Sequence, residues 1–409
     1  MLLTLTIFPS VELTLVVSVI FVLVFLISSK PFIDKYLFNL LLLLSIISSV
    51  GLFSSLFKTP EVINVIKDLS HYLKPILTLL TGYLFAKKIN DTHYLIKSII
   101  IVATILAIKH IIIFAFTTDF SKIVISDIRN EGGVGSFIEL LAMVFLLSSK
   151  KWGIFNVFKR KINHQIILII LSFSFVLYFS RTMLLGIVLI TLSVMGYTKL
   201  NAKGLKYIFV FLTLFISFYF VLLNVNINPD KPGIENFFYK IKNAPSEIFS
   251  APDGYDPRDH KRIFDRWRAY EAKLALEEME GNYFNYLIGN GFGSLVDLKF
   301  KAPLNDEGMR YIPIIHNGYV YVLFKTGIVG LFIYLIFLAS LYTQSYKKAY
   351  SMNEKAIRNL ISGIGLYYIF SSLIITGIYN LGEVLSLLLG VILYILLLTR
   401  KNAIEKIEV

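Results

Sequence analysis

The sequence contains no cysteine, so the chain can form no disulfide bond and has no thiol for nucleophilic or redox chemistry. Charged residues are also scarce: they make up 16% of the 409 residues, whereas hydrophobic residues make up 56%. The mean hydropathy is +0.70. A water-soluble protein of this length needs a mostly polar surface, so this composition excludes one and indicates an integral membrane protein.

Several functional signatures are missing as well. The first apolar run has no basic head and no small-residue exit, so we expect no cleavable signal peptide. The sequence has no Walker loop, no G-x-S-x-G turn and no HExxH-like pair of histidines. Gly289-Asn-Gly-Phe-Gly293 lacks the preceding strand and the following Lys-Ser/Thr of a nucleotide-binding loop, so we interpret it as a turn. The absence of internal repeats argues against a transporter built from inverted repeats.

Long apolar runs are present from end to end, and they predict helices. A membrane barrel would alternate apolar and polar residues, whereas segments such as 40–50 and 166–179 are apolar on nearly every face. The predicted fold class is therefore all-α, a polytopic transmembrane bundle of about eleven spans with one large external loop that carries an amphipathic helix. The predicted spans are about 11–29, 37–56, 72–86, 94–116, 133–149, 164–180, 182–198, 205–225, 317–343, 357–378 and 381–399.

The basic residues between these spans predict which loops are cytoplasmic. Clusters of Lys and Arg fall in alternate loops, which the positive-inside rule assigns to the cytoplasm: 30–35, 87–88, 150–161, 199–206, 347–358 and 400–401. The loops around 57–71, 117–132, 180–181, 226–315 and 379–381 are then external. We expect a membrane bundle over 1–225, an external cap over 226–315 with a helix at about 257–279, further spans over 316–400 and a cytoplasmic tail over 401–409.

The net charge of +13 does not indicate nucleic-acid binding, because this topology and anionic lipid headgroups account for the basic loops. In the external segment 226–315, twelve Lys and Arg are offset by fourteen Asp and Glu. We therefore expect membrane lipids, and no nucleic acid, among the partners.

Arginines on the external side are candidates for binding phosphate. Arg258, Arg262 and Arg266 recur every fourth residue and share one face of the predicted cap helix, where their planar guanidiniums could clamp phosphate oxygens. A solvated basic face is the alternative. Arg181 interrupts an apolar stretch at Ser180-Arg181-Thr182, where a charge is costly unless it is paired or functional. Arg129 lies just before the fifth span.

The remaining candidates are two acids and one histidine. Glu139 and Glu383 lie in apolar surroundings near the external side, where each could pair with an arginine or orient a sugar. His316 directly follows the long external segment and opens an apolar helix. Histidine takes up and releases protons near neutral pH, so His316 is the candidate general base. A hydrogen-bonded structural histidine is the alternative.

Together these features resemble the O-antigen polymerase and O-antigen ligase superfamily of polytopic glycosyltransferases, over about residues 117–399. The residues that carry the resemblance keep the order of that family: the Arg129 loop, Ser180-Arg181-Thr182, Arg266 with Tyr270 and Ala272, Leu287-Ile-Gly-Asn-Gly-Phe-Gly-Ser294, and His316-Asn317 followed by Gly327 and Gly330. Glu139 departs from it, since relatives often have a small or amide residue there.

The resemblance implies an inverting, metal-independent enzyme without a cofactor, which polymerises undecaprenyl-diphosphate-linked oligosaccharides at the external side of the bacterial inner membrane, with a chain-length regulator as a further partner. It implies His316 as the catalytic residue and Arg129, Arg181 and Arg266 as ligands of the diphosphate. Further candidates for binding or orienting substrate are Arg258, Arg262, Tyr270, Asn317, Glu139 and Glu383. Transfer of finished polymer to lipid A core by a ligase, and transport of lipid-linked oligosaccharide by a flippase, remain the alternatives.

Overall fold

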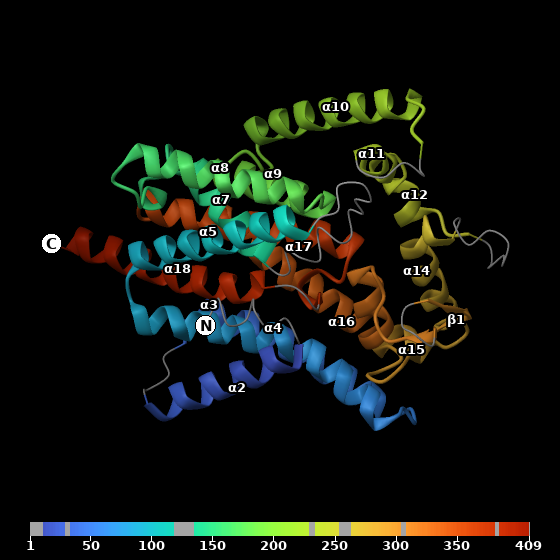
Figure 1. Ribbon diagram of the computed structural model, residues 1–409. Helices are drawn as coiled ribbons and strands as arrows, with labels where there is room; N and C mark the ends of the chain where they lie inside the picture. Colours follow the sequence, from blue (N-terminus) through green and yellow to red (C-terminus); the bar gives the residue numbers. More distant parts are fainter. Residues whose placement is uncertain are drawn as a thin grey trace.

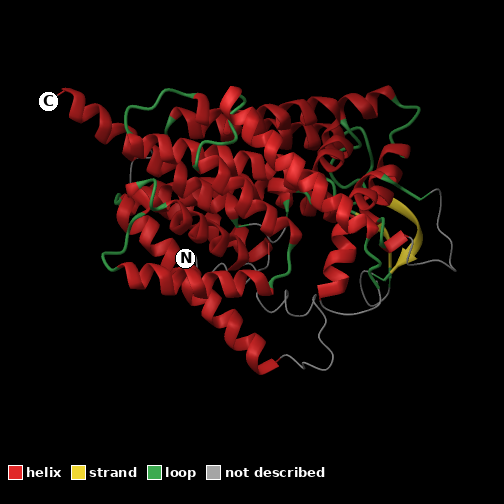
Figure 2. Cartoon of the chain, turned by 90° about the horizontal axis from the view of Figure 1, so that it is seen from above, coloured by secondary structure: helices red, strands yellow, loops and turns green. Residues whose placement is uncertain are grey.

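The computed structural model describes residues 11–28, 33–117, 135–228, 234–252, 263–303, 308–380 and 384–408. The described chain is a bundle of long helices with a smaller group of short helices and two strands at one end (Figure 1). The C-terminus lies at the opposite end, and the view from above in Figure 2 has the same arrangement.

Each predicted span overlaps a long helix, which confirms the all-α polytopic fold. The helices are α2 (Val11–Ser28), α3 (Lys35–Ser55), α4 (Val62–Ile89), α5 (Thr92–Thr117), α7 (Gly135–Ser148), α8 (Lys161–Leu177), α9 (Arg181–Val194), α10 (Ala202–Asn224), α16 (Gly318–Tyr342), α17 (Met352–Ile374) and α18 (Leu385–Glu408). Short 3-10 helices follow α7, α16 and α17 at Gly153–Phe155 (η1), Thr343–Tyr346 (η2) and Gly377–Tyr379 (η3).

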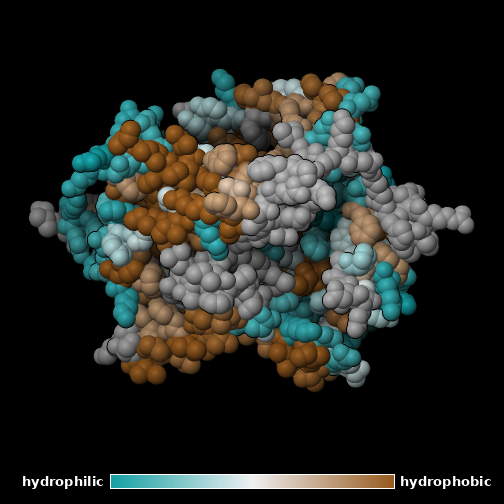
Figure 3. Space-filling view, in the orientation of Figure 1, coloured by the Kyte–Doolittle hydropathy of each residue, from teal (hydrophilic) through white to brown (hydrophobic). Residues whose placement is uncertain are grey.

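The apolar character of these helices fits a multi-pass membrane protein. Within the described residues, six helices are long and apolar enough to cross a membrane, namely α3, α5, α10, α16, α17 and α18. The apolar helices α2, α7, α8 and α9 are shorter. In Figure 3 hydrophobic residues gather on the left half of the visible face, whereas hydrophilic residues line its left end and much of its right side. Helix α10 stands apart from the bundle in Figure 1, and nearly all its side chains are exposed, as in a helix that faces lipid.

The external loop predicted over 57–71 is wrong for most of its length, because α4 already begins at Val62. Asp68 lies in the part of α4 that was predicted to be loop, and its carboxylate is buried inside the bundle. There it accepts a hydrogen bond from the Lys325 ammonium of α16, with 2.6 Å between Oδ2 and Nζ, and both side chains are fully buried. A distant partner thus allows a charge within the helix.

The segment between α10 and α16 is not purely helical. It contains α11 (Ile234–Lys242), α12 (Ala244–Phe249), α14 (Trp267–Glu277) and α15 (Tyr283–Ile288), then an antiparallel pair of strands, β1 (Val296–Ala302) and β2 (Met309–Ile312). We did not predict the strands, although burial alternates along β1 as it does in a strand with one face inward. The cap helix predicted at 257–279 corresponds to α14, and residues 253–262 lie outside the described part.

A turn at residues 289–293 joins this segment to the bundle. Its backbone amides donate to α16, from Asn290 to the Phe324 carbonyl oxygen at 2.7 Å and from Gly291 to the Lys325 carbonyl oxygen at 3.1 Å. The Gly293 amide donates to Asp68 at 2.6 Å, and the Lys325 ammonium also donates to the Ser294 carbonyl. The turn and the ion pair therefore form one buried unit.

Two glycines allow this close approach. Gly289 has φ +82°, and a Cβ on it would lie 2.4 Å from the Lys325 carbonyl carbon. Gly327 has φ +64°, and a Cβ there would lie 2.3 Å from the Leu287 carbonyl oxygen. Both angles are strained for residues with side chains. The glycine turn was thus correctly interpreted, and Gly327 is a kink inside α16 where the turn is seated.

We expect Lys325→Met to lower the free energy of unfolding by about 3–5 kcal/mol, because it leaves the Asp68 carboxylate buried without its cation. The double variant Asp68→Asn/Lys325→Met should recover part of this loss, since no buried charge remains. Unfolding of the purified protein in detergent measures both. Lys97→Met, the same change at an exposed lysine of α5, is the control. If Lys325→Met and Lys97→Met are equally stable, the Asp68–Lys325 ion pair has no structural role.

Candidate functional site

His316 lies between β2 and α16, where the external segment returns to the bundle. Asn317 caps α16, since its side-chain oxygen accepts from the backbone amides of Tyr319 at 3.1 Å and Val320 at 3.2 Å. The Gly318 amide donates to the Ile375 carbonyl oxygen at 3.0 Å, which holds the start of α16 against the end of α17. The backbone at His316 is therefore held by helix capping and by helix packing.

The imidazole of His316 is oriented by a buried carboxylate. Its Nδ1 lies 2.9 Å from Oε2 and 3.2 Å from Oε1 of Glu271, and the His316 backbone amide donates to Oε2 at 2.8 Å. A carboxylate without a proton only accepts hydrogen bonds, so this contact favours the tautomer with the proton on Nδ1, in which Nε2 can accept one. Glu271 is 1% exposed, whereas the His316 side chain is 50% exposed. The pair thus presents a proton acceptor to the solvent-accessible side.

Sequence reasoning missed Glu271, which it named only among the acids that would balance the alternative, a solvated basic face. In α14 it lies among the buried residues Tyr270, Leu274 and Ala275. Leu274 and Ala275 follow Glu271 by three and four residues, the spacing of one helix face. An acid at a position of the apolar face was the available signal, because such a carboxylate needs a buried partner.

A second polar cluster is built by α9, α11, α12 and α14. Ser180 caps α9, and the following Arg181 donates to Glu247 with 3.0 Å between Nη2 and Oε2, and also to the Lys240 carbonyl oxygen. Arg268 donates to the other oxygen of Glu247. One carboxylate of α12 therefore bridges two guanidiniums from different helices.

These residues line a cavity of about 270 Å³. Arg181, Lys240 and Arg268 contribute positive charge to its wall, and Glu247 and Asp265 contribute negative charge. Asp265 is engaged by the Tyr239 hydroxyl at 2.9 Å. A guanidinium carries five N–H donors in a planar fork, which matches the oxygens of an anion such as a phosphate group.

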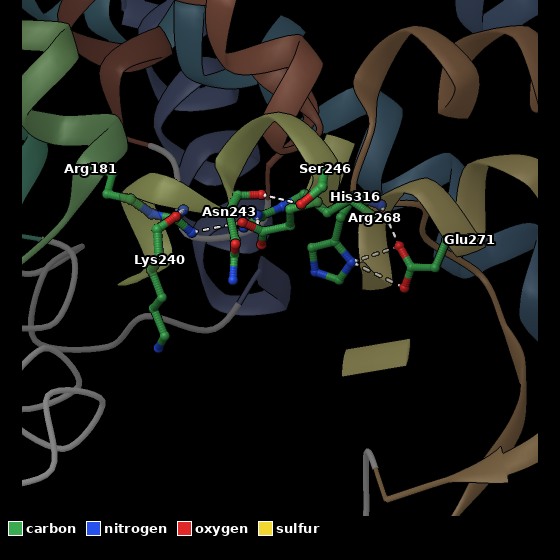
Figure 4. Close-up of polar contacts among 8 residues, drawn as sticks. Arg181, Lys240, Asn243, Ser246, Arg268, Glu271 and His316 are labelled. Carbon is green, nitrogen blue, oxygen red and sulfur yellow. Dashed lines mark hydrogen bonds and ion pairs between the residues drawn. The ribbon is translucent and has the colours of Figure 1, made fainter. Parts of the chain in front are cut away.

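Helix α14 connects this cavity to the histidine. Arg268 and Glu271 are three residues apart in the same helix, so their Cβ atoms are about 5–6 Å apart on one face. Figure 4 shows the resulting row, in which the His316 ring lies between Glu271 on one side and Arg181, Lys240 and Asn243 on the other. Helix α14 thus contributes Arg268 to the cavity and Glu271 to the orientation of the proton acceptor.

The other described candidates have local partners. Arg266 is the N-terminal cap residue of α14, and its side chain makes no hydrogen bond or ion pair with residues that the structure describes. The buried Tyr270 hydroxyl donates to the Leu298 carbonyl oxygen at 2.8 Å, which attaches α14 to β1. Burial raises the pKa of Tyr270, and the charges of Glu277 and Asp297 raise it further. Tyr270 therefore has a structural role here, because it holds α14 against β1.

Glu139 is fully buried in α7. It accepts a hydrogen bond from the Tyr178 hydroxyl at 2.9 Å. The Tyr178 ring lies 4.3 Å from the ring of His110, whose Nδ1 is 2.9 Å from the Ser174 hydroxyl. The partner of Glu139 is therefore a tyrosine. The remaining predicted site residues lie outside the described residues, namely Arg129, Arg258, Arg262 and Glu383.

Comparison with protein families gives one match. Residues 166–335 match the family described as O-antigen ligase. The matched region runs from α8 to the middle of α16 and includes Arg181, Glu247, Arg268, Glu271 and His316. It confirms the resemblance to the O-antigen polymerase and ligase superfamily, whose members are glycosyltransferase-like enzymes. No curated protein matches the chain.

The cavity at Arg181 should bind inorganic pyrophosphate, a soluble probe for its anion preference. We expect Arg181→Ala to weaken this binding by about tenfold to a hundredfold, the effect of losing a hydrogen bond to a charged group. Arg181→Lys should restore little of it, because an ammonium lacks the planar fork of a guanidinium. Titration calorimetry on the purified protein with EDTA present measures the affinities.

Arg310→Ala is the matched control, because Arg310 is an exposed arginine of β2 that pairs with Asp297 outside this cavity. The Arg310 guanidinium holds the pKa of Asp297 below its usual range, so this pair is already satisfied. If Arg181→Ala and Arg310→Ala bind pyrophosphate equally, the cavity is not the anion site.

Proposed function

We propose that this protein is an inverting membrane glycosyltransferase that joins undecaprenyl-diphosphate-linked oligosaccharide repeat units into O-antigen or a related surface polysaccharide. The observation that carries the proposal is the row on α14, where Arg268 faces a cationic cavity and Glu271 orients the exposed imidazole of His316. The family match over residues 166–335 supports the same class of enzyme.

In the proposed reaction, His316 is the general base. A hydroxyl of the acceptor sugar attacks the anomeric carbon of the donor and passes its proton to Nε2 of His316. Glu271 keeps Nδ1 protonated and stabilises the imidazolium that forms, which makes it a positioning residue. Attack from the face opposite the leaving group inverts the anomeric carbon.

The bond between the anomeric carbon and the diphosphate oxygen breaks as the new bond forms, and its electron pair leaves with undecaprenyl diphosphate. Arg181 and Arg268 stabilise the charge that grows on this leaving group, together with predicted ligands such as Arg129 and Arg266. The diphosphate would take the place of the Glu247 carboxylate, which meets both guanidiniums in its absence. Such fixed guanidiniums supply the electrostatic stabilisation that a divalent metal supplies in other transferases.

A ligase reaction is the second candidate, because the description of the matched family is O-antigen ligase. It would use the same donor chemistry and the same base, with lipid A core as the acceptor in place of a second lipid-linked repeat unit. We place the reaction at the external side of the bacterial inner membrane, in agreement with the distribution of basic loops. A chain-length regulator would be a further partner of a polymerase.

Purified protein should convert a synthetic undecaprenyl-diphosphate-linked repeat unit into a ladder of longer chains, resolved by gel electrophoresis. We expect the ladder also in EDTA, because the proposed leaving-group stabilisation uses arginines. Transfer only to added lipid A core would identify a ligase. Loss of activity in EDTA with recovery in magnesium or manganese would transfer the leaving-group role to a metal.

His316→Ala should reduce the rate of synthesis by about a hundredfold to ten-thousandfold, as expected for the loss of one acid–base group. Donor binding should be largely kept, whereas the Arg181 variant should lose it. Glu271→Gln should lower kcat with little change in the donor KM, because an amide can donate to Nδ1 and leave the proton on Nε2. Initial rates over a range of donor concentrations separate these effects.

His316→Gln tests the structural alternative, because glutamine keeps a hydrogen bond but takes up no proton at neutral pH. Near-normal synthesis by this variant would show that the base lies elsewhere. Glu139 and Glu383 would then be the next residues to test.

A further inference from the structure

A basic cavity lies at the end of the bundle remote from His316. It is formed where α16 ends, and Gly318 and Tyr342 are separated by the length of that helix, about 36 Å. The cavity has a volume of about 240 Å³. Its walls come from the start of α3, the chain between α16 and α17, α17 itself and the middle third of α18: Asp34, Tyr36, Gln344, Lys347, Lys348, Tyr350, Arg358, Leu393, Leu396, Leu397 and Arg400. The positive-inside pattern predicts this end to be cytoplasmic.

One cation of this cavity is held in a fixed orientation by neighbouring side chains. Arg358 is buried and is held by Glu354, with Nε to Oε1 at 2.8 Å, and by the Gln344 side-chain oxygen, with Nη1 to Oε1 at 2.7 Å. Gln344 is itself buried. These contacts orient the guanidinium and neutralise one charge.

Three further cations surround the mouth without such neutralisation. Lys347 lies over the Tyr36 ring at 4.9 Å and Arg400 over the Tyr350 ring at 6.0 Å. Lys347, Lys348 and Arg400 make no salt bridge in the part of the chain that the structure describes. Burial lowers the pKa of Lys347, and the charges of Arg358 and Arg400 lower it further. With Asp34 as the one acid on the wall and Glu354 behind Arg358, positive charge is in excess.

An apolar groove adjoins this cavity. The groove has a volume of about 470 Å³ and shares Leu397 and Arg400 with the basic cavity. Its lining includes Leu398, Ile404 and the edge-to-face rings of Tyr83 and Tyr394, whose centroids are 5.3 Å apart. Besides Arg400, the polar residues that line it are Lys87, Asn90, Lys401 and Glu405. A compartment of positive charge therefore continues into one whose wall is largely the apolar surface of leucine, isoleucine and tyrosine side chains. Free phosphate would use the first compartment only, whereas an amphiphile would use both.

We propose that this double cavity binds an anionic phospholipid, with its phosphate-bearing headgroup among Arg358, Lys347 and Arg400 and an acyl chain in the groove beside Leu397 and Tyr394. Charge complementarity selects the anion, and the continuity of the two compartments selects a lipid over a soluble phosphate. The site is remote from the proposed catalytic row and does not depend on it. Bound lipid would join α3, α17 and α18 at the end where their basic residues otherwise repel one another.

The test measures lipid binding by native mass spectrometry of the delipidated full chain in detergent. Phosphatidylglycerol should bind well, phosphatidylcholine weakly, and inorganic phosphate and glycerol 3-phosphate weakly. Lys347→Gln/Arg400→Gln should reduce the affinity for phosphatidylglycerol about thirtyfold, because each cation near an anionic headgroup contributes roughly a factor of five. Either single variant should give about the fivefold effect, which keeps the test usable if the double variant folds poorly.

Lys355→Gln is the matched control, since Lys355 is an exposed lysine of the same end of the bundle that does not line the cavity. Its affinity for phosphatidylglycerol should stay within about twofold of the unmodified chain. If Lys355→Gln and Lys347→Gln lose the same affinity for phosphatidylglycerol, the lipid is attracted by the basic surface in general and not bound at this site. Binding of glycerol 3-phosphate or inorganic phosphate as tight as that of phosphatidylglycerol would overturn the assignment to a lipid.

Discussion

The buried ion pair between Asp68 and Lys325 is the constraint on which the arrangement of the site depends. Two fully buried charges have a large desolvation cost, so each must keep its partner wherever the helices pack. The pair joins α4 to α16, and the amide of Gly293 and the carbonyl of Ser294 complete its hydrogen bonds. The external segment is thereby held to the bundle at the turn that precedes β1. His316 lies two residues before α16, the helix that contains Lys325, so the ion pair holds the helix from which the histidine is positioned.

Helix α14 contributes side chains to both polar parts of the site, the histidine pair and the arginine cluster. Its Tyr270 hydroxyl is bonded to β1, and its Glu271 carboxylate to both the backbone and the ring of His316. One turn earlier, Arg268 reaches Glu247 and through it Arg181 of the bundle. A movement of α14 would therefore change the proton acceptor and the anion cavity together. Such coupling suits a transfer reaction, because the base and the stabiliser of the leaving group must be in place at the same time.

The sequence predicts the helices well because each span is encoded locally, by consecutive apolar residues and by the charges beside them. What it does not predict depends on partners far along the chain. The buried role of Asp68 was missed because Lys325 is 257 residues away, and the pairing of Glu271 was missed because His316 is 45 residues away. The same limit affects the arginines. The regular spacing of the arginines made Arg266 a candidate, but the side chain that contacts Glu247 is that of Arg268. Helix α14 begins only at Trp267, and the packing of this helix on β1 sets its orientation.

The cations at the two ends of the bundle differ in how they are balanced, and this difference has a physical consequence. Arg181 and Arg268 share a carboxylate, so their geometry is maintained before any anion arrives, and an incoming phosphate must replace an existing partner. That exchange lowers affinity but favours a ligand that can meet both guanidiniums at once. Lys347 and Arg400 lie over aromatic rings, which orient a cation weakly and leave its charge available. Attraction there acts on any anion held at the membrane surface. The balanced end is therefore suited to selecting a substrate that must later leave, and the unbalanced end to retaining a lipid.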